Sequence, residues 1–356
     1  MKHTNTIEKK NYNGIDLMKF ICIFFIISIH TSPFPVDTSS MIFKYMNFYF
    51  KNTIGRVAVP LFFVASSFLL FRKMKENLDF EVFKKYIKRL FSLYLIWTAV
   101  YLPLIIEKII NAESIGVGIT NFLKKFIFDG SYLHLWYLPS LIVAISILYF
   151  LLKKKVNIKN IIIIAIVLYV LGLLAQSWFG IIRPLKTISP FIWNILLKVK
   201  EVIFTTRNGL FEGFIFVVLG YLFATKEFNL NIKKNIIGIM VFAGVLVIEA
   251  SALKLLNITR LYDMYLSLIP LSFFIFNFFK NIELKNNIKY KYFRHSSSLI
   301  YFMHMLFVVL FKRIITNSPL DECFVYYLSI AISLVLSLVI IILSENKKLK
   351  WLKVLY

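Results

Sequence analysis

The sequence of 356 residues is 59% hydrophobic and 17% charged, and its mean hydropathy of +0.75 is far above that of water-soluble domains. This composition excludes an ordinary soluble enzyme and a disordered chain, because the excess of apolar side chains must face something other than water, and lipid is the simplest partner. The 42 Lys and Arg residues against 18 Asp and Glu give a net charge of +24, which in a soluble protein would suggest nucleic acid, so the placement of the charges must decide their meaning.

Ten apolar stretches are long enough to cross a bilayer, whose core of about 30 Å needs about 20 residues of helix. They are continuously apolar rather than amphipathic, which favours helices that span the membrane over helices that lie on its surface. The sequence therefore predicts an all-α polytopic membrane protein with one domain over residues 1–356. The ten predicted helices lie at 15–35, 54–71, 90–109, 134–152, 157–178, 208–225, 235–253, 263–279, 297–315 and 323–343.

Lys and Arg residues are typical of cytoplasmic loops, so their distribution orients these helices. With both termini inside, 26 of the 42 lie in inner segments and 14 in outer segments, while Lys19 and Arg56 fall within the membrane. The bias predicts two cytoplasmic termini and a multi-pass protein of a bacterial cytoplasmic membrane, with the lipid bilayer as its partner. It also accounts for the positive charge without nucleic acid.

Signatures of soluble enzymes are absent from the sequence, which contains no GxSxG, HExxH, GxGxxG or GxxxxGK[ST] motif and no His/Cys cluster at metal-ligand spacing. We therefore expect no metal and no tightly bound cofactor. Any chemistry must come from ionisable side chains within or at the edges of the helices. Such side chains cost about 2.5–3.5 kcal/mol each at mid-helix, so each of them needs a structural or functional reason.

The first stretch contains Asp16, Lys19 and His30. Lys19 and His30 are eleven residues apart, so they share one helix face at a separation of about 16 Å along the axis. This spacing suits a helix that binds a charged group near the inner surface and places an imidazole further out to accept a proton, with Asp16 paired to Lys19. Alternatively, Asp16 and Lys19 anchor the helix at the interface, and His30 is a satisfied polar residue.

A dense basic segment follows the second stretch and includes Lys85, Lys88 and Arg89. It is either an orientation signal that contacts anionic lipid or a cradle for the phosphates of a cytoplasmic donor, because Lys and Arg bind phosphates at such boundaries. The charge alone leaves both interpretations open.

Five further candidate positions lie in or next to later stretches. His134 and Trp136 open the fourth stretch, where they fit either an aromatic belt at the interface or a binding site. Glu212 lies about one turn after Arg207, as either a structural ion pair or part of a polar pocket. His304 lies well inside the ninth stretch, where an isolated histidine usually faces a cavity or another helix. The sequence leaves open whether the three histidines meet.

Taken together, these segments resemble the acyltransferase 3 family of bacterial integral membrane proteins. The resemblance covers essentially the whole chain, and residues 30–33 and 207–211 are most similar to the membrane domain of the vancomycin-resistance serine racemases. In the family's first helix an Arg precedes the His by eleven residues, whereas here Lys19 stands at the Arg position. The segments that carry the resemblance are residues 14–19, His30, residues 56–68, residues 134–139 and residues 298–304.

The resemblance implies a ten-helix enzyme that transfers an acyl group, usually acetyl from cytoplasmic acetyl-CoA, to a hydroxyl of a carbohydrate or related cell-envelope acceptor at the outer face. It implies that His30 acts as base or acyl carrier, that Lys19 and Asp16 organise the donor end, and that the phosphates are held by the basic segment. The implied donor-phosphate ligands are Lys85, Lys88 and Arg89, and the implied acceptor-site residues are His134, Trp136, Arg207, Glu212 and His304.

The similarity to the racemase membrane domains also supports a second interpretation. In that interpretation the chain is a transporter or substrate-delivery module for a small amino acid or sugar, and the same buried polar residues line its path. Binding of acetyl-CoA to the purified protein distinguishes the two interpretations.

Overall fold

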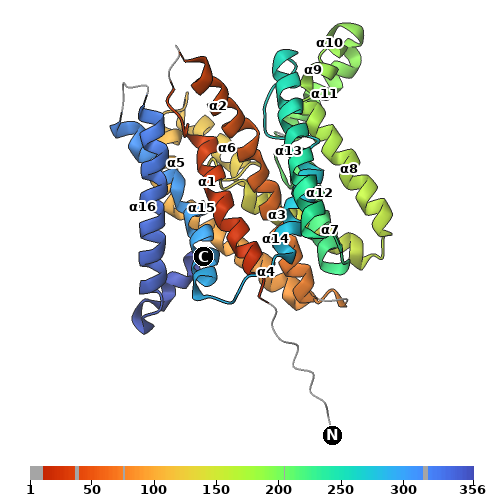
Figure 1. The fold of residues 1–356 in the computed structure, drawn as a ribbon. Helices are drawn as coiled ribbons and strands as arrows, with labels where there is room; N and C mark the ends of the chain where they lie inside the picture. The colour runs from red at the N-terminus through yellow and green to blue at the C-terminus, as the bar shows by residue number, and fades with distance from the viewer. Residues whose placement is uncertain (1–10, 37–39, 75–76, 204, 316–319) are drawn as a thin grey trace.

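The computed structural model describes residues 11–36, 40–74, 77–203, 205–315 and 320–356. Within these ranges the regular structure is entirely helical, which confirms the all-α prediction, and the long helices run side by side along one direction (Figure 1). The α-helices are α1 (Asn13–His30), α2 (Met41–Asn52), α3 (Ala58–Met74), α4 (Phe80–Val100), α5 (Leu102–Ile110), α6 (Ile115–Phe128), α7 (Tyr137–Lys153), α8 (Ile158–Ala175), α9 (Phe179–Ile182), α10 (Leu185–Ile188), α11 (Pro190–Ile203), α12 (Phe214–Thr225), α13 (Ile232–Leu255), α14 (Leu268–Asn281), α15 (Ile288–Ile314) and α16 (Asp321–Leu343), together with the 3₁₀ segments η1 (Ile54–Val57) and η4 (Lys347–Leu355) and the π-helical turn η3 (Gly209–Gly213).

Six helical segments of the described chain are long and apolar enough to cross a membrane, or seven if the bent pair α4 and α5 forms one span. Three shorter apolar helices, Tyr137–Lys153, Gly209–Thr225 and Leu268–Asn281, coincide with three of the remaining predicted stretches. All ten predicted stretches thus overlap apolar helices. The protein is a multi-pass helical membrane protein by these criteria, whereas ten crossings and cytoplasmic termini stay predictions.

The stretch predicted as one helix at 90–109 is wrong in its shape, because α4 and α5 meet at Tyr101 with a bend of 60°. Pro103 lies in the first turn of α5, and a proline has no N–H to continue the hydrogen-bond ladder of α4. The hydroxyl of Tyr101 donates to the carbonyl of Phe302 in α15 at 2.8 Å, so the corner is attached to the centre of the bundle.

Several segments between the predicted stretches are helical, namely α2, α6, α9, α10 and α11, and α10 lies at the top of the view in Figure 1. Charged residues such as Lys44 in α2 and Lys124 in α6 interrupt their apolar sequence, so a search for continuous apolar stretches passes over them. These helices build the end of the bundle where α1 terminates.

Helix α1 contacts α3, α14 and α15, and α12 packs closely on α3. Small and hydroxyl side chains allow this approach, as where Ser67 donates to the carbonyl of Val217 at 2.6 Å. The start of α1 and the C-terminal Tyr356 lie toward the same end of the bundle, which we name the basal end (Figure 1). The opposite end, where α1 finishes at His30, is the apical end.

Candidate functional site

Two hollows lie along α1, one toward each end of the bundle. The basal cavity, of about 590 Å³, is lined by Asp16 and Lys19 near the start of α1. The apical chamber, of about 40 Å³, is lined by His30 at the end of α1. Tyr301 of α15 lines both hollows and therefore forms part of the wall between them. The predicted separation of Lys19 and His30 along one helix face thus corresponds to two neighbouring hollows.

The basal cavity is rich in positive charge. Its lining includes Lys19, Lys73, Lys85, Arg89 and Arg294, which come from four different helices. A concave site with this many cations favours a ligand that carries several negative charges.

Two of the three basic residues predicted to bind donor phosphates, Lys85 and Arg89, line this cavity. Lys88 is exposed and lies outside the lining. Positions 85 and 89 are one helical turn apart, whereas position 88 is turned by about 100° from position 89 and lies to one side of the cavity lining. The role of Lys88 stays a prediction.

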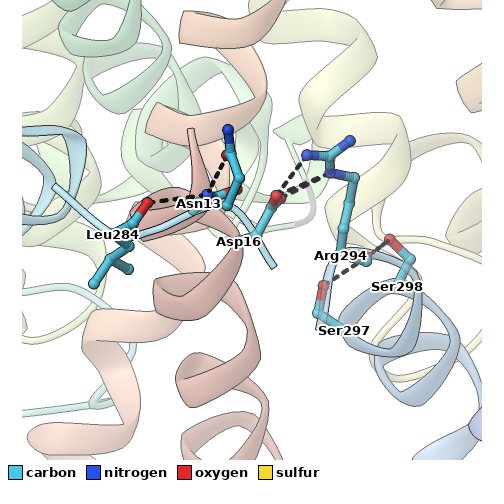
Figure 2. A network of polar contacts seen from close by, with 7 residues as sticks. Asn13, Asp16, Leu284, Arg294, Ser297 and Ser298 are labelled. Carbon is cyan, nitrogen blue, oxygen red and sulfur yellow. Dashed lines mark hydrogen bonds and ion pairs between the residues drawn. The ribbon is translucent and has the colours of Figure 1, made fainter. Parts of the chain in front are cut away.

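Asp16 is paired with Arg294 of α15 rather than with Lys19 (Figure 2). The Nε of Arg294 donates to both carboxylate oxygens at 3.0 Å, and its Nη2 donates to Oδ2 at 2.6 Å. Asp16 is 5% exposed and Arg294 is 46% exposed, so the carboxylate is buried under the guanidinium. The planar guanidinium offers a two-pronged fit that an ammonium lacks, which explains why the arginine displaces the expected partner.

The ammonium of Lys19 therefore lies in the cavity beside an aromatic wall, 6.0 Å from the centroid of the Phe62 ring. Tyr137 and Tyr301 continue this wall, with ring centroids 5.6 Å apart. The Tyr301 hydroxyl donates to the backbone carbonyl of His134, which fixes the wall to the apical chamber. A change at Tyr301 would act on both sites.

The three predicted histidines lie close together at the apical chamber, where His30 and His134 are lining residues and His304 contacts them without lining the chamber. The ring centroids of His30 and His304 are 5.5 Å apart, and those of His134 and His304 are 5.0 Å apart. His134 and His304 are buried. The imidazoles come from the end of α1, the segment before α7 and the middle of α15, so only the folded bundle could join them.

Backbone carbonyls fix the orientation of two of these rings. His134 Nε2 lies 3.0 Å from the carbonyl oxygen of Phe302, and His304 Nδ1 lies 2.8 Å from that of Tyr301. A carbonyl oxygen only accepts, so each of these nitrogens must carry the hydrogen. In the neutral rings, His134 Nδ1 and His304 Nε2 are then bare acceptors, and neither has a hydrogen-bond partner among the described residues. His134, which lines the chamber, therefore offers it a buried proton acceptor, and His304 holds a second one close by.

Glu212 adds a carboxylate to the same chamber. It is buried, lines the chamber with His30, and its Oε2 has no hydrogen-bond partner within the described part of the chain. Asn208 caps the turn that carries it, because its Oδ1 accepts from Leu210 N at 2.9 Å. Gly209 has no space for a side chain, since a Cβ would lie 2.1 Å from the carbonyl oxygen of Ser140. Single π-helical turns of this kind are frequent at functional sites.

Arg207 does not form the ion pair with Glu212 that the sequence left open. Its Nη2 lies 3.6 Å from the carboxylate of Asp129, and its guanidinium lies 5.1 Å from the centroid of the Trp136 ring. The alternative of a polar pocket is therefore the better description of Glu212. Burial raises the pKa of the Asp129 carboxyl, and the nearby Arg207 opposes that shift.

Sequence reasoning missed several residues of the two hollows. Arg56 and Asp263 form an ion pair in the lining of the apical chamber. Both lie within predicted apolar stretches, so the cost of a charge there was the signal that could have identified them. Lys73 of the basal cavity belongs to the dense basic segment considered as a phosphate cradle, whereas Arg294 was hidden among many basic boundary residues. Tyr301 lies in the segment 298–304 that carries the family resemblance, but no role was predicted for it, because its place between the two hollows depends on the fold.

The described residues contain no group of three or more His, Cys, Asp and Glu side chains with the geometry of a metal site. The arrangement can bind a polyanion at the basal end and accept protons from a polar group at the apical end. An aromatic wall separates the two functions. The predicted site residues from α1, α4, α7, η3 and α15 all lie near one or the other hollow, Lys88 excepted.

The chain is similar to several curated proteins of enterococci. Two proteins of Enterococcus faecalis, each named amino-acid racemase, are 31% identical over 76% of this chain and 27% identical over 88% of it. A serine/alanine racemase of Enterococcus gallinarum is 29% identical over 74% of the chain. These matches cover 36%, 43% and 36% of the respective relatives, so the chain spans less than half the length of each.

No solved structure matches the chain. The family model described as acyltransferase domain matches residues 12–344, which include both hollows and nearly every described helix. The chain therefore belongs to the acyltransferase 3 family.

Proposed function

We propose that the protein is a membrane O-acyltransferase that moves an acetyl group from cytoplasmic acetyl-CoA to a hydroxyl of a carbohydrate or related cell-envelope acceptor. The observation that carries the proposal is the pair of hollows with opposite chemistry that share Tyr301. A transferase that uses substrates from both sides of a membrane needs two such sites, joined at the reacting atoms.

The donor binds in the basal cavity. Acetyl-CoA has phosphates at one end and the reactive thioester at the other, joined by a flexible arm. Lys85 and Arg89 hold the phosphates, and the ammonium of Lys19 lies deeper along α1. The thioester then reaches the aromatic wall at Tyr301, with the apical histidines beyond it.

The acceptor hydroxyl binds in the apical chamber beside His30. His30 accepts the hydroxyl proton while the oxygen attacks the thioester carbonyl, so that a C–O bond forms and the C–S bond breaks. The proton passes from His30 to the thiolate of coenzyme A, which leaves as a thiol. His134 and His304 supply bare ring nitrogens that orient the acceptor through hydrogen bonds to its hydroxyl groups.

The distribution of charge supports the direction of transfer. Apart from Lys19, which lies within the first predicted helix, the basic residues of the basal cavity belong to the segments that the positive-inside rule places in the cytoplasm. The apical residues His30, Arg207 and Asp263 lie toward the predicted outer side. A cytoplasmic donor and an external acceptor would then meet through the protein without crossing the membrane themselves.

The test is binding of acetyl-CoA to the purified full-length chain, followed by transfer of labelled acetyl to extracted cell-envelope carbohydrate. We expect saturable binding that Arg89→Gln weakens and that His30→Ala leaves unchanged, with transfer lost in His30→Ala. If millimolar acetyl-CoA does not bind, the proposal fails and the transport interpretation of the sequence takes its place. If acetyl-CoA binds and His30→Ala transfers at the parent rate, the assignment of His30 is wrong.

A further inference from the structure

A third hollow opens beside the apical chamber, between α5, α6 and the segment before α7. This lateral vestibule has a volume of about 180 Å³ and is lined by Lys108, Lys125, Asp129, Tyr132 and Arg207. Arg207 also lines the apical chamber, so the vestibule and the chamber share this side chain. A molecule in the vestibule would touch the same guanidinium that borders the histidines.

The charges of the vestibule are unbalanced. Three cations face one carboxylate, Asp129, and that carboxylate is already paired with Arg207. The ammonium of Lys108 lies 4.2 Å from the centroid of the Tyr132 ring. Neither Lys108 nor Lys125 has a carboxylate within ion-pair distance in the described ranges, since Glu107 next to Lys108 binds Arg313 at 2.6 Å instead. Two positive charges of the vestibule therefore remain available to a ligand.

The Arg207 and Asp129 side chains form a contact that a ligand can open. Their closest atoms are 3.6 Å apart, which is longer than a charge-assisted hydrogen bond of about 2.7–2.9 Å. Trp136 supports the guanidinium from one face. Gly130, with φ of +86°, lets the chain turn between Asp129 and Trp136, where a Cβ would lie 2.4 Å from Trp136 N. Trp136 thus holds the Arg207 guanidinium in place, while the long contact to Asp129 leaves its N–H groups able to bind a ligand.

We propose that the lateral vestibule binds an anionic group, a carboxylate or a phosphate monoester, through Lys108, Lys125 and Arg207. The identification of this group as part of the acceptor rests on the proposed function; the anion site itself does not. The volume is below the range of about 300–1,000 Å³ that is typical of pockets for drug-sized ligands, so it suits one small unit such as an acidic sugar. An acceptor anchored there by its acid would place its hydroxyl groups toward His30 and His134.

The test measures the binding of three sugars to the purified full-length protein in detergent by isothermal titration calorimetry. Glucuronate carries a carboxylate, glucose 6-phosphate carries a phosphate, and glucose is the neutral control. We expect at least one of the two acids to bind saturably and glucose to bind at least tenfold more weakly. Which acid binds more tightly identifies the preferred anion. Raising the salt concentration should weaken the binding of the acid, because screening reduces the attraction between exposed charges.

The variant Lys108→Gln/Lys125→Gln should lower the affinity for the preferred acid about tenfold. Lys124→Gln is the matched control, because Lys124 is an exposed neighbour on α6 that does not line the vestibule, and it should bind like the parent. Unchanged elution and thermal unfolding of the variants show that they fold. Glucose binding as tightly as the acids, no saturable binding of either acid to the parent, or equal affinity in the double variant would each overturn the proposal.

The same protein separates this proposal from the proposed function. Acetyl-CoA binding is measured in parallel, and its cavity at the basal end contains neither Lys108 nor Lys125. Lysine-dependent binding of the acids without acetyl-CoA binding leaves the anion site valid and refutes the acyltransferase. Acetyl-CoA binding without binding of either acid refutes the anion site and leaves the proposed acyltransferase function standing.

Discussion

The basal cavity and the apical chamber lie on one helix, yet they are built in opposite ways. The basal cavity is large, about 590 Å³, and its charged groups come from long flexible side chains such as Lys85 and Arg89. The apical chamber is small, about 40 Å³, and its rings are fixed by backbone carbonyls, as at His134 and His304. A roomy cationic site suits binding of a large donor, whereas a tight site with fixed acceptors suits the positioning of reacting atoms.

The difference also shows how each site deals with charge. Among the described residues, Arg294 is the one lysine or arginine of the basal cavity with a carboxylate within hydrogen-bond distance, and we expect the other lining cations to meet the phosphates of the proposed donor. In the apical chamber Arg56 and Asp263 neutralise one another. Substitutions at the basal end should therefore change binding, and substitutions at the apical end should change the chemical step.

The largest expected effect is at His30. His30→Ala removes the proposed base, so we expect the rate of acetyl transfer to fall by about 10²–10⁴-fold, the usual contribution of a general base. The dissociation constant for acetyl-CoA should not change, because His30 does not line the basal cavity. Single-turnover transfer and equilibrium binding are measured on the same preparation. If His30→Ala weakened acetyl-CoA binding by the same factor as it lowered the transfer rate, the claim that the two hollows have separate roles would be wrong.

The next effect is at Tyr301, which belongs to both sites. Tyr301→Ala opens the wall between them and admits water, so we expect transfer to fall about 100-fold, as for a misplaced reacting group, and the share of acetyl-CoA that is hydrolysed to rise. Tyr301→Phe keeps the ring and loses only the bond to the His134 carbonyl, worth about 0.5–1.5 kcal/mol. It should retain most of the transfer with little hydrolysis. Equal product ratios in both variants would show that Tyr301 is no barrier.

A smaller effect is expected at the basal end. Arg89→Gln should raise KM for acetyl-CoA about tenfold with little change in kcat, because it removes a contact made equally before and during the reaction. Lys88→Gln, on the same helix but outside the cavity lining, is the control and should match the parent. Equal losses at both positions would indicate a general effect of surface charge. Initial rates over a range of acetyl-CoA concentrations give both constants.

The smallest effect concerns pH and Asp129. Burial raises the pKa of this carboxyl above its ordinary value, so the folded state binds the proton more tightly than the unfolded state. This carboxyl therefore makes folding more favourable as the pH falls through its raised pKa, and its charge costs stability above it. Asp129→Asn should remove this pH-dependent gain in the free energy of unfolding. The melting temperature of the parent relative to the variant should rise between pH 7 and pH 4; a constant difference would show that the pKa is not raised.

Much of the fold could be predicted from the continuous apolar stretches, because a helix that faces lipid can be apolar on all sides. All ten predicted stretches overlap apolar helices. The bend at Tyr101 was not predicted, although Pro103, which has no N–H to continue the hydrogen-bond ladder, was a signal for it in the sequence. The hydrogen bond from Tyr101 to the Phe302 carbonyl, which joins residues 201 positions apart, could not be read from the sequence. Helices α2 and α6 were also missed, because lysines such as Lys44 and Lys124 interrupt their apolar sequences and leave no continuous stretch of about 20 residues.

The site was predictable where a single residue is costly in its own setting. His304 is an isolated imidazole in a long apolar helix, and the structure places it beside His30 and His134. The interaction partners of the site residues were harder to predict than the site residues themselves. Local spacing favoured Lys19 for Asp16, but the tertiary fold brings Arg294, whose fork fits the carboxylate better. Pair assignments depend on which helices become neighbours, and sequence spacing within one helix does not reveal that.

The central claim is that one acetyl group passes from a donor at the basal end to an acceptor at the apical end. Sealed proteoliposomes that contain the protein in a single orientation test it most directly, with labelled acetyl-CoA confined to the side of the basal cavity and the cell-envelope carbohydrate confined to the other side. The account predicts labelled carbohydrate only in this arrangement, and none when the two substrates exchange sides. Equal labelling in both arrangements, or labelling only when donor and acceptor share one side, would contradict it.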